Sequence, residues 1–502
     1  MAWFNCIAGT FTEKWTGGGV CRGTLARMPT EVNEKQEEVF LSMSILIKNG
    51  TVITAADRYL ADILVEGEQI IAVGLGLKAV ATEEVDATGM YVFPGAVDVH
   101  THFDLSVAGT VTADDFRTGT IAAAAGGTTC IIDFAIQPRG GTLRQGRDIW
   151  HEKADGKCAI DYSFHLILND LTETVLSEIP EMILQGYPSI KLFMPYKGIL
   201  QVDDATIFRV LQLVGKLGGL VMVHAENGDI IEVLVKDALA AGQVDPIYHA
   251  LTRPSVTEEE AVNRFITMVR LSAASGYVVH LSSAGALEKV EAARKEGVSI
   301  FAETCPQYLF LDLDRYREPD FGGAKYVMSP PLREKGNEVH LWRGLANGSL
   351  QAVATDHCSF NWHGQKELGR DNFTKIPNGM PGVENRVQLL YAGGVVPGKI
   401  SIHKFIDLVS TAPAKLFGLF PRKGTIAPGS DADLVIFNPE APFTITGSKQ
   451  HQNVDYNPYE GFSGKGVPEK VYCRGKLIMD GNRFVGEIGY GRFQPRNRFS
   501  CL

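Results

Sequence analysis

Short apolar runs alternate with helix-length segments through the middle of the chain, a pattern typical of repeated strand–helix units. The runs end at turn-forming or polar residues, as buried parallel strands do. Eight candidate strands end at His100, Phe134, Leu168, Met194, His224, Leu281, Glu303 and Asp356. Eight such units predict a (β/α)8 TIM barrel within an α/β fold. The alternative, an open doubly wound sheet, is less favoured because no Gly-rich phosphate turn follows the first strand.

The two ends of the chain have a different pattern. Short β-rich pieces separated by Gly and Asp turns occupy residues 43–93 and return in residues 424–485. We expect these two segments to pair into one small β-sandwich domain. The barrel domain would then span residues 94–423, and residues 486–502 would form a C-terminal tail.

Residues 1–42 differ from the rest of the chain. They lack the charged, apolar and small-residue layout of a signal peptide and show no sustained periodicity. Residues 37–39 (EEV), shortly before Met43, can be encoded by GAG GAG GTN, which resembles a bacterial ribosome-binding site. We therefore expect the native protein to start at Met43 and residues 1–42 to be an extension. The alternative is a poorly ordered N-terminal arm.

The composition excludes several classes of function. Charged residues make up 21% and apolar residues 45% of the chain, the balance of an ordinary soluble protein. The formal net charge of −10 argues against a basic nucleic-acid-binding surface. No window approaches the roughly 20 apolar residues that a membrane helix needs. We expect a cytoplasmic protein that binds neither nucleic acid nor membrane.

The eight cysteines are scattered and form no CxxC pair. In a chain of this length they indicate reduced thiols rather than a disulfide framework or a thiolate metal site. Cys358 follows His357, which raises the alternative of a Cys/His nucleophile. A packed thiol is favoured, because adjacent residues on an extended strand point to opposite sides.

Metal-binding residue types recur at the carboxyl ends of the predicted barrel strands, where barrel enzymes place their active sites. His100 and His102 lie two residues apart on the first strand, so both imidazoles face the same side. The other candidates are Lys191 on the fourth strand, His224 on the fifth, His280 on the sixth and Asp356 on the eighth. Four histidines and an aspartate at one rim predict a site for divalent metal ions.

Lys191 lies inside the apolar run SIKLFM, where an unpaired charge is costly. An ammonium group cannot bind a cation, but nearby divalent ions would lower the pKa of the amine. The neutral amine can react with CO2 to give a carbamate whose two oxygens bridge two metals. The remaining ligands would be His100, His102 and Asp356 on one ion and His224 and His280 on the other. The alternative is a lysine that extends its ammonium into solvent.

Two metal ions about 3.5–4 Å apart can share a hydroxide, because metal-bound water ionises near neutral pH. Asp356 can take the proton of that hydroxide and pass it to a leaving nitrogen. The predicted reaction class is metal-assisted hydrolysis of an amide or ester bond.

Several longer stretches match a known family. They include PGAVDVHTHFDL, SIKLFMPYKG, VMVHAENGD, SPPLREK, ATDHCSF and QKELGRDNFTKIPNG. With others they run from about residue 43 to residue 490, and they resemble the dihydropyrimidinase/hydantoinase branch of the amidohydrolase superfamily. The resemblance implies a hydrolase that opens dihydropyrimidines or 5-monosubstituted hydantoins to N-carbamoyl amino acids.

The resemblance also implies a cofactor set and substrate contacts. Two divalent ions, with Zn2+ the first expectation, would be held by the six residues above, with Lys191 carboxylated. Tyr196 would bind substrate and stabilise the oxyanion, beside Asp356 as the proton carrier. Ser329 and Asn378 match positions whose main-chain groups hold the amide and imide edge of the ring. The expected partner is a small cyclic amide or ureide, and the expected assembly is a homotetramer or a homodimer.

Two alternatives stay open beside this interpretation. Dihydroorotases and allantoinases usually carry an arginine shortly after the HxH pair, whereas Phe103, Asp104 and Leu105 follow it here. Phe103 and Leu105, with Phe193 and Leu200, would line an apolar ring pocket or belong to the core. Collapsin response mediator proteins keep this fold as scaffolds without most metal ligands, whereas all six candidate ligands are present here.

Overall fold

The structure is a computed structural model that describes residues 44–107 and 109–499. The expectation for residues 1–42 lies outside the described residues. The described residues form one compact unit that contains both the barrel and the sheet built from the chain ends. The domain boundaries at 93/94 and 423/424 therefore remain predictions.

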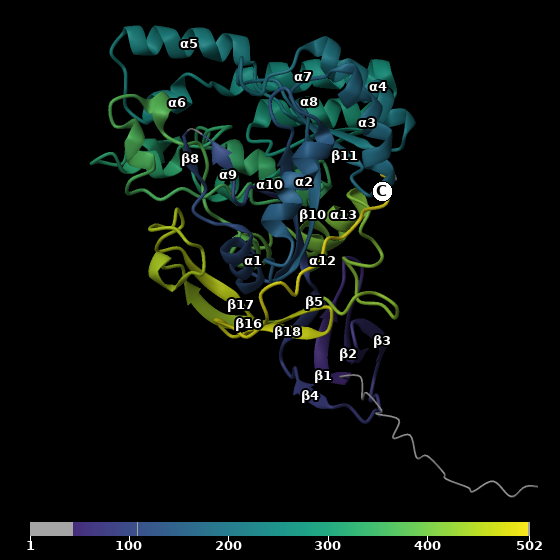
Figure 1. The fold of residues 1–502 in the computed structure, drawn as a ribbon. Coiled ribbons are helices and arrows are strands. Elements are labelled where there is room, and N and C mark those ends of the chain that lie inside the picture. The colour runs from purple at the N-terminus through teal and green to yellow at the C-terminus, as the bar shows by residue number, and fades with distance from the viewer. Residues whose placement is uncertain (1–43, 108, 500–502) are drawn as a thin grey trace, which may run out of the picture. The chain divides into compact units, whose positions relative to one another are not determined.

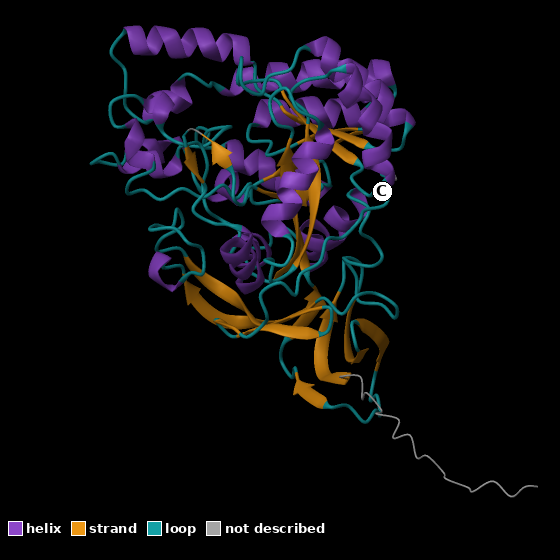
Figure 2. Ribbon diagram, viewed as in Figure 1, coloured by secondary structure: helices purple, strands orange, loops and turns teal. Residues whose placement is uncertain are grey.

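Eight parallel strands within the described residues form the barrel sheet (Figures 1 and 2). In spatial order they are β6 (Ala96–Thr101), β9 (Thr128–Ile136), β10 (Asp161–Ile167), β11 (Ser189–Phe193), β12 (Leu220–His224), β13 (Gly276–Val278), β14 (Ile300–Thr304) and β15 (Ala352–Val353). The circle closes where Thr101 bridges His357 and the His102 N–H donates to the His357 carbonyl at 2.8 Å. The predicted TIM barrel is confirmed, with its eight strands in the predicted order.

Helices cover the outside of the barrel sheet (Figure 2). The longer ones are α1 (Phe116–Ala125), α2 (Leu143–Ala154), α3 (Glu173–Leu184), α4 (Asp204–Lys216), α5 (Gly228–Ala240), α7 (Ser255–Ser272), α8 (Ala284–Lys295) and α10 (Asn337–Asn347). The short ones are α6 (Ile247–Leu251), α9 (Pro306–Phe310), α11 (Arg386–Leu390), α12 (Ile402–Ile406) and α13 (Ala412–Leu416). Several begin at a side-chain cap, such as Asp115 for α1 and Ser283 for α8, which satisfies an otherwise unpaired N–H.

The barrel has two apolar layers because its strands are buried on both faces. One layer lies inside the barrel and includes Val97, Ile132 and Met222. The other lies between the strands and the helices and includes Ile131, Leu166 and Val221. Neighbouring residues such as Ile131 and Ile132 therefore face opposite layers, which explains why these strands appear in the sequence as continuous apolar runs.

The two ends of the chain pair into one sheet of nine strands within the described residues, which confirms the predicted pairing of the two ends. The first end contributes β1 (Ser44–Ile53), β2 (Arg58–Glu66), β3 (Gln69–Gly74), β4 (Glu83–Asp86) and β5 (Tyr91–Pro94). The second contributes β16 (Leu434–Thr444), β17 (Ser463–Cys473), β18 (Lys476–Asp480) and β19 (Arg483–Phe484). The two ends join where β5 pairs antiparallel with β16. A two-stranded hairpin, β7 (Ser106–Val107) with β8 (Thr110–Val111), follows the first barrel strand.

The segment after β19 runs along the amino-terminal end of the barrel. Arg496 is buried there, and its guanidinium donates to the Ser163 and Ser189 hydroxyls and to the Phe164 carbonyl. These contacts lie at the end of the barrel opposite the candidate ligands, so this segment supports the barrel without reaching the site.

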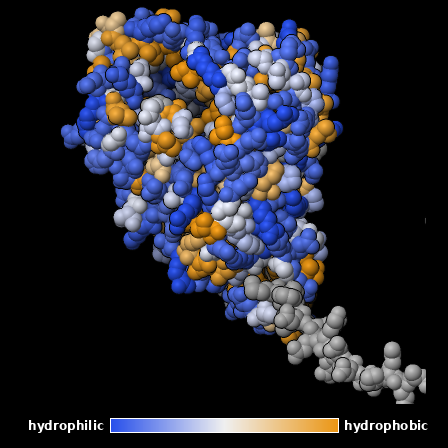
Figure 3. All heavy atoms as spheres, viewed as in Figure 1, coloured by the Kyte–Doolittle hydropathy of each residue, from blue (hydrophilic) through white to orange (hydrophobic). Residues whose placement is uncertain are grey.

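The face of the molecule in Figure 3 is largely hydrophilic, with small and separate apolar patches. Within residues 44–107 and 109–499, no helix combines the length and the apolar character needed to cross a membrane.

A buried cluster of charges joins the barrel to the sheet domain. The Lys423 ammonium is 1% exposed and lies 2.8 Å from Asp161, at the start of β10, and 2.7 Å from Asp433, just before β16. Arg474 also donates to Asp161, at 3.1 Å. Burial alone would lower the pKa of Lys423, but these two carboxylates outweigh it and hold that pKa well above its usual value.

We expect Lys423→Met to lower the free energy of unfolding by about 3–5 kcal/mol, because it leaves buried carboxylates without their central cation. Denaturant unfolding followed by circular dichroism would measure the change. Lys465→Met is the matched control, since Lys465 forms an exposed pair with Glu440, and its unfolding midpoint should stay at the wild-type value. A Lys423→Met protein as stable as the wild type would contradict this assignment.

Candidate active site

Three candidate ligands meet at the carboxyl end of the barrel. The Nε2 atoms of His100 and His102 lie 3.2 and 3.3 Å from Oδ1 of Asp356. One possible ligand atom from each residue lies within 4.8 Å of the others. The HxH pair on β6 and the aspartate after β15 thus form a group that can hold a divalent cation.

Two more histidines lie beside this group. His224 ends β12, and its ring centre is 4.4 Å from that of His280, which follows β13. The His280 ring is in turn 5.4 Å from the His100 ring. Nδ1 of His280 is buried and has no hydrogen-bond partner among the described residues. A buried nitrogen without a partner is costly unless it binds a ligand, which fits a metal-binding role.

Lys191, on β11, lies between the two groups of histidines. Its amine is 5.1 Å from the centre of the Phe134 ring and 5.0 Å from that of Phe193. The Phe134 ring is 4.5 Å from the His100 ring, and the Phe193 ring is 5.6 Å from the His224 ring. Lys191 is only 1% exposed, so its amine does not extend into solvent, and no ion pair of it is found among the described residues.

Burial gives most of these groups the protonation state that a cation requires. It lowers the pKa of His102 and His224, and it lowers that of Lys191 to about 7. Burial also lowers the pKa of His280, well below its usual value. Neutral imidazoles and an amine that loses its proton easily can act as ligands, or in the case of lysine react with CO2.

The two acidic neighbours of His100 set its charge. Burial lowers the pKa of His100, but the carboxylates of Asp356 and Glu303 outweigh it and raise that pKa to about 9. Asp356 is also buried, which raises its pKa, yet the neighbouring histidines hold it well below its usual value. The negative charges of Asp356 and Glu303 thus favour a positive charge at His100, and a divalent ion bound there would replace the proton.

Two carboxylates that the sequence analysis did not single out orient the histidines. Glu303, at the end of β14, accepts from Nδ1 of His100 at 2.5 Å, which leaves Nε2 free to face Asp356. Glu226 accepts from Nε2 of His224 at 2.6 Å, which leaves Nδ1 free. Such carboxylate–histidine pairs set the tautomer and orientation of metal ligands. Two sequence features could have identified them: Glu303 ends the seventh predicted strand, and Glu226 lies two residues after His224.

Three of the candidate residues have left-handed backbone angles that the sequence did not reveal. The φ angles are 38° at His280, 52° at Asp356 and 69° at Tyr196. Residues other than glycine rarely adopt this region, and it is enriched at functional sites. The turns place His280 and Asp356 beyond the last residues of their strands.

One of the candidate substrate contacts, Tyr196, lies next to His224. The Tyr196 ring is 5.4 Å from the His224 ring. Burial raises the pKa of Tyr196 to about 12, against the opposing charge of Arg253, so its hydroxyl keeps its proton. The side-chain amide of Asn378 donates to the Ser329 hydroxyl at 3.3 Å. The structure thus brings Ser329 and Asn378 together although 49 residues separate them.

Cys358 and His357 do not form a nucleophile pair. Cys358 is buried, its thiol faces the Asn378 carbonyl at 3.7 Å, and burial raises its pKa. His357 instead donates from Nε2 to Asp114 at 3.0 Å and accepts the Gly382 N–H at Nδ1. This arrangement fits the packed thiol that the sequence favoured.

The apolar residues suggested as a ring pocket divide into two groups. Phe103 is fully buried, with its ring against Phe116 and His357, and Leu105 is buried in the same cluster, so both belong to the core. Phe193 and Leu200 instead pack beside Tyr196 at the mouth of the barrel.

A (β/α)8 barrel with four histidines, a lysine and an aspartate at its mouth is typical of hydrolases that use metal ions. The chain matches the model of the amidohydrolase family over residues 91–478, and it belongs to that family. Its similarity to proteins of the dihydropyrimidinase/hydantoinase branch confirms the resemblance drawn from the sequence.

Relatives and solved structures match over nearly the whole chain. A D-hydantoinase from Geobacillus stearothermophilus is 52% identical over 461 residues, which cover 92% of this chain and 98% of that protein. The crystal structure of a dihydropyrimidinase from Brevibacillus agri is 51% identical with a TM-score of 0.91, covering 92% of this chain and 100% of the other. An L-hydantoinase from Arthrobacter aurescens is 28% identical with a TM-score of 0.82, covering 90% and 99%.

We expect Glu303→Gln to weaken metal binding by about 10–100-fold, because the neutral amide no longer orients and polarises His100. Metal retained after dialysis against a graded series of chelator concentrations would measure the change. Glu296→Gln serves as the control, since Glu296 is exposed and pairs with Arg270 far from the site. Equal metal retention by the Glu303→Gln and wild-type proteins would contradict the orienting role.

Proposed function

We propose that the protein hydrolyses the cyclic amide bond of dihydropyrimidines or 5-monosubstituted hydantoins and releases N-carbamoyl amino acids. The observation that carries the proposal is the meeting of His100, His102 and Asp356 with two further histidines and Lys191 at the barrel mouth. The names of the relatives, D-hydantoinase and dihydropyrimidinase, support the same substrate class.

The residues at the barrel mouth fit two divalent ions, for which we propose Zn2+. His100, His102 and Asp356 would hold one ion, and His224 and His280 the other. Lys191, carried as a carbamate, would bind both. Burial of its amine, its pKa of about 7 and its place between the two histidine groups support this role. The unpartnered Nδ1 of His280 supports a ligand at that position.

When bound, two divalent ions supply a water of lowered pKa and polarise the ring carbonyl. The Asp356 carboxylate accepts the proton of that water and donates it to the ring nitrogen as the C–N bond breaks. The Tyr196 hydroxyl, which keeps its proton, donates a hydrogen bond to the carbonyl oxygen as negative charge develops there. One water is consumed, and the ring opens to a carboxylate and a carbamoylated amine.

We propose that the main-chain groups of Ser329 and Asn378 hold the amide and imide edge of the ring. The hydrogen bond between their side chains and the position of Tyr196 beside His224 support this proposal. The absence of an arginine after the HxH pair makes the dihydroorotase and allantoinase alternative less suitable. The full set of candidate ligands argues against a non-catalytic scaffold.

We infer that the reaction takes place in the cytoplasm. The cysteines among the described residues are buried free thiols, as expected in a reducing compartment. A homotetramer, or a homodimer, stays a prediction from the family resemblance.

The most direct test is a side-by-side assay of dihydrouracil and several 5-substituted hydantoins with metal-supplemented protein and chiral analysis of the products. We expect ring opening of at least one of these substrates and its loss after metal removal. Protein that holds less than one ion per chain and opens neither ring would overturn the proposal in favour of a scaffold.

We expect Asp356→Asn to lower kcat by about 10²–10⁴-fold, because an amide cannot accept and return the proton. The metal content should stay largely unchanged, since the amide oxygen remains a possible ligand. Asp480→Asn is the control, because Asp480 lies in the sheet domain and pairs with Lys470. Appreciable remaining turnover in Asp356→Asn would count against the assigned role.

We expect Lys191→Ala to lose both ions and activity, with partial recovery when a short carboxylic acid is supplied in solution. The acid would restore the two bridging oxygens that the carbamate provides. Lys197→Ala is a matched control, because Lys197 lies shortly after the same strand but pairs with Asp229 at the surface. Unchanged metal content in Lys191→Ala would refute the bridging role.

A further inference from the structure

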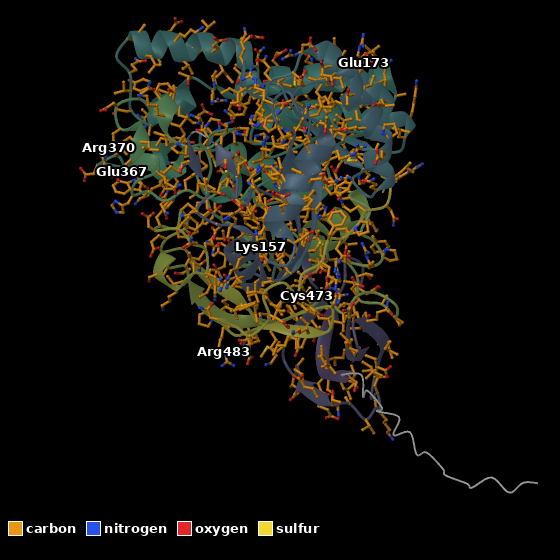
Figure 4. All side chains as sticks on the ribbon, in the orientation of Figure 1. Lys157, Glu173, Glu367, Arg370, Cys473 and Arg483 are labelled. Atoms are coloured by element: carbon orange, nitrogen blue, oxygen red, sulfur yellow. The ribbon has the colours of Figure 1, made fainter. Side chains whose placement is uncertain are left out.

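A second fully buried lysine lies outside the proposed reaction. Lys366 is 0% exposed and begins the short 3-10 helix η3 (Lys366–Gly369). Its neighbours on the same segment, Glu367 and Arg370, form a 2.7 Å pair at the outer edge of the molecule, as Figure 4 shows. The segment thus turns one cation inward and another outward.

The Lys366 ammonium donates its hydrogen bonds to main-chain oxygens and lies 5.8 Å from the centre of the Phe360 ring. Nζ donates three hydrogen bonds of 2.7 Å, to the carbonyls of Val327, Pro377 and Gly379. No ion pair of Lys366 is found among the described residues. Burying an ammonium without a counter-charge is costly, so a lysine at this position needs a specific reason. Its three N–H donors match the three carbonyls one to one.

The three carbonyls belong to the two segments that carry the proposed substrate contacts. Pro377 and Gly379 stand directly before and after Asn378, and Val327 lies two residues before Ser329. The Gly379 N–H also donates to the Val327 carbonyl at 3.0 Å. The Lys366 ammonium therefore links the residues on either side of Asn378 to the segment that precedes Ser329.

We propose that Lys366 is a positioning residue for substrate recognition, which sets the spacing between the main chain at Ser329 and the main chain at Asn378. This inference rests on the proposed function, in which these two positions hold the amide and imide edge of the ring. Lys366 itself does not touch the substrate. Its effect is exerted through the two segments that it joins.

Lysine suits this position better than other long side chains. A methionine of similar length would leave two of the three buried carbonyls, those of Pro377 and Gly379, without donors, and an arginine would present a planar fork to three convergent acceptors. Burial lowers the pKa of Lys366 to about 7, and the neighbouring Cys358 acts in the opposite direction.

The test is the split between KM and kcat in Lys366→Met, with dihydrouracil and a 5-substituted hydantoin as substrates. Contacts to the ring edge act in both the ground state and the transition state, so their loss should raise KM by about tenfold or more and change kcat less than about threefold. The metal content should equal that of the wild type. Lys366→Gln keeps two N–H donors, and we expect it to give an intermediate KM. It carries the same test if Lys366→Met does not fold.

Two controls separate positioning from general destabilisation. Lys423→Met also removes a buried lysine with several oxygen partners, but at the opposite end of the barrel, and should lower stability without raising KM. Arg370→Met removes the exposed cation of the same segment and should leave KM, kcat and metal content at wild-type values.

A KM within twofold of the wild-type value in a folded Lys366 variant would overturn the inference. A raised KM that is fully explained by loss of bound metal would overturn it as well. A wild-type protein that opens neither ring would overturn the proposed function and this inference with it. An active wild type beside a Lys366→Met protein of unchanged KM would overturn the inference alone.

Discussion

Hydrogen bonds between the first and last barrel strands hold the two parts of the candidate ligand set together. The Thr355 hydroxyl donates to Asp98 at 2.7 Å, and the His102 N–H donates to the His357 carbonyl at 2.8 Å. These bonds close the barrel and bring the HxH pair against an aspartate that lies more than 250 residues later in the chain. Without this closure the site would have separate histidines and carboxylates rather than one cation-binding group.

Burial then determines the chemistry of the groups that closure brings together. It favours the neutral forms of His102, His224, His280 and Lys191, while the histidines keep Asp356 ionised. The carboxylates of Glu303 and Glu226 accept hydrogen bonds from His100 and His224 and so determine which ring nitrogen of each histidine faces the site. Burial and hydrogen bonding also act together at Lys366. Its buried ammonium has no counter-charge among the described residues and is tolerated because it donates to three carbonyls. Because little solvent reaches these groups, each hydrogen bond or charge partner has a stronger electrostatic effect than it would have in water.

The barrel and the candidate ligands at its mouth could be predicted because both depend on local patterns. Apolar runs mark the strands, and strand alternation places the histidines of the HxH pair on one side. The carboxyl ends of parallel strands share one rim, which made Lys191, His224 and Asp356 candidates for one site. Glu303 could not be paired with His100 in the same way, because their contact spans 203 residues and depends on the rotation of each side chain.

The sequence by itself therefore determined the strand order, the pairing of the two chain ends and the residue types at the barrel mouth. Tertiary structure alone decided the left-handed turns at His280 and Asp356, the partner of each histidine nitrogen and the carbonyl cage around Lys366. The physical reason is the distance along the chain over which each kind of interaction acts. Periodicity and turn chemistry act over a few residues, whereas the burial and hydrogen bonding of a side chain are set by segments distant in the chain.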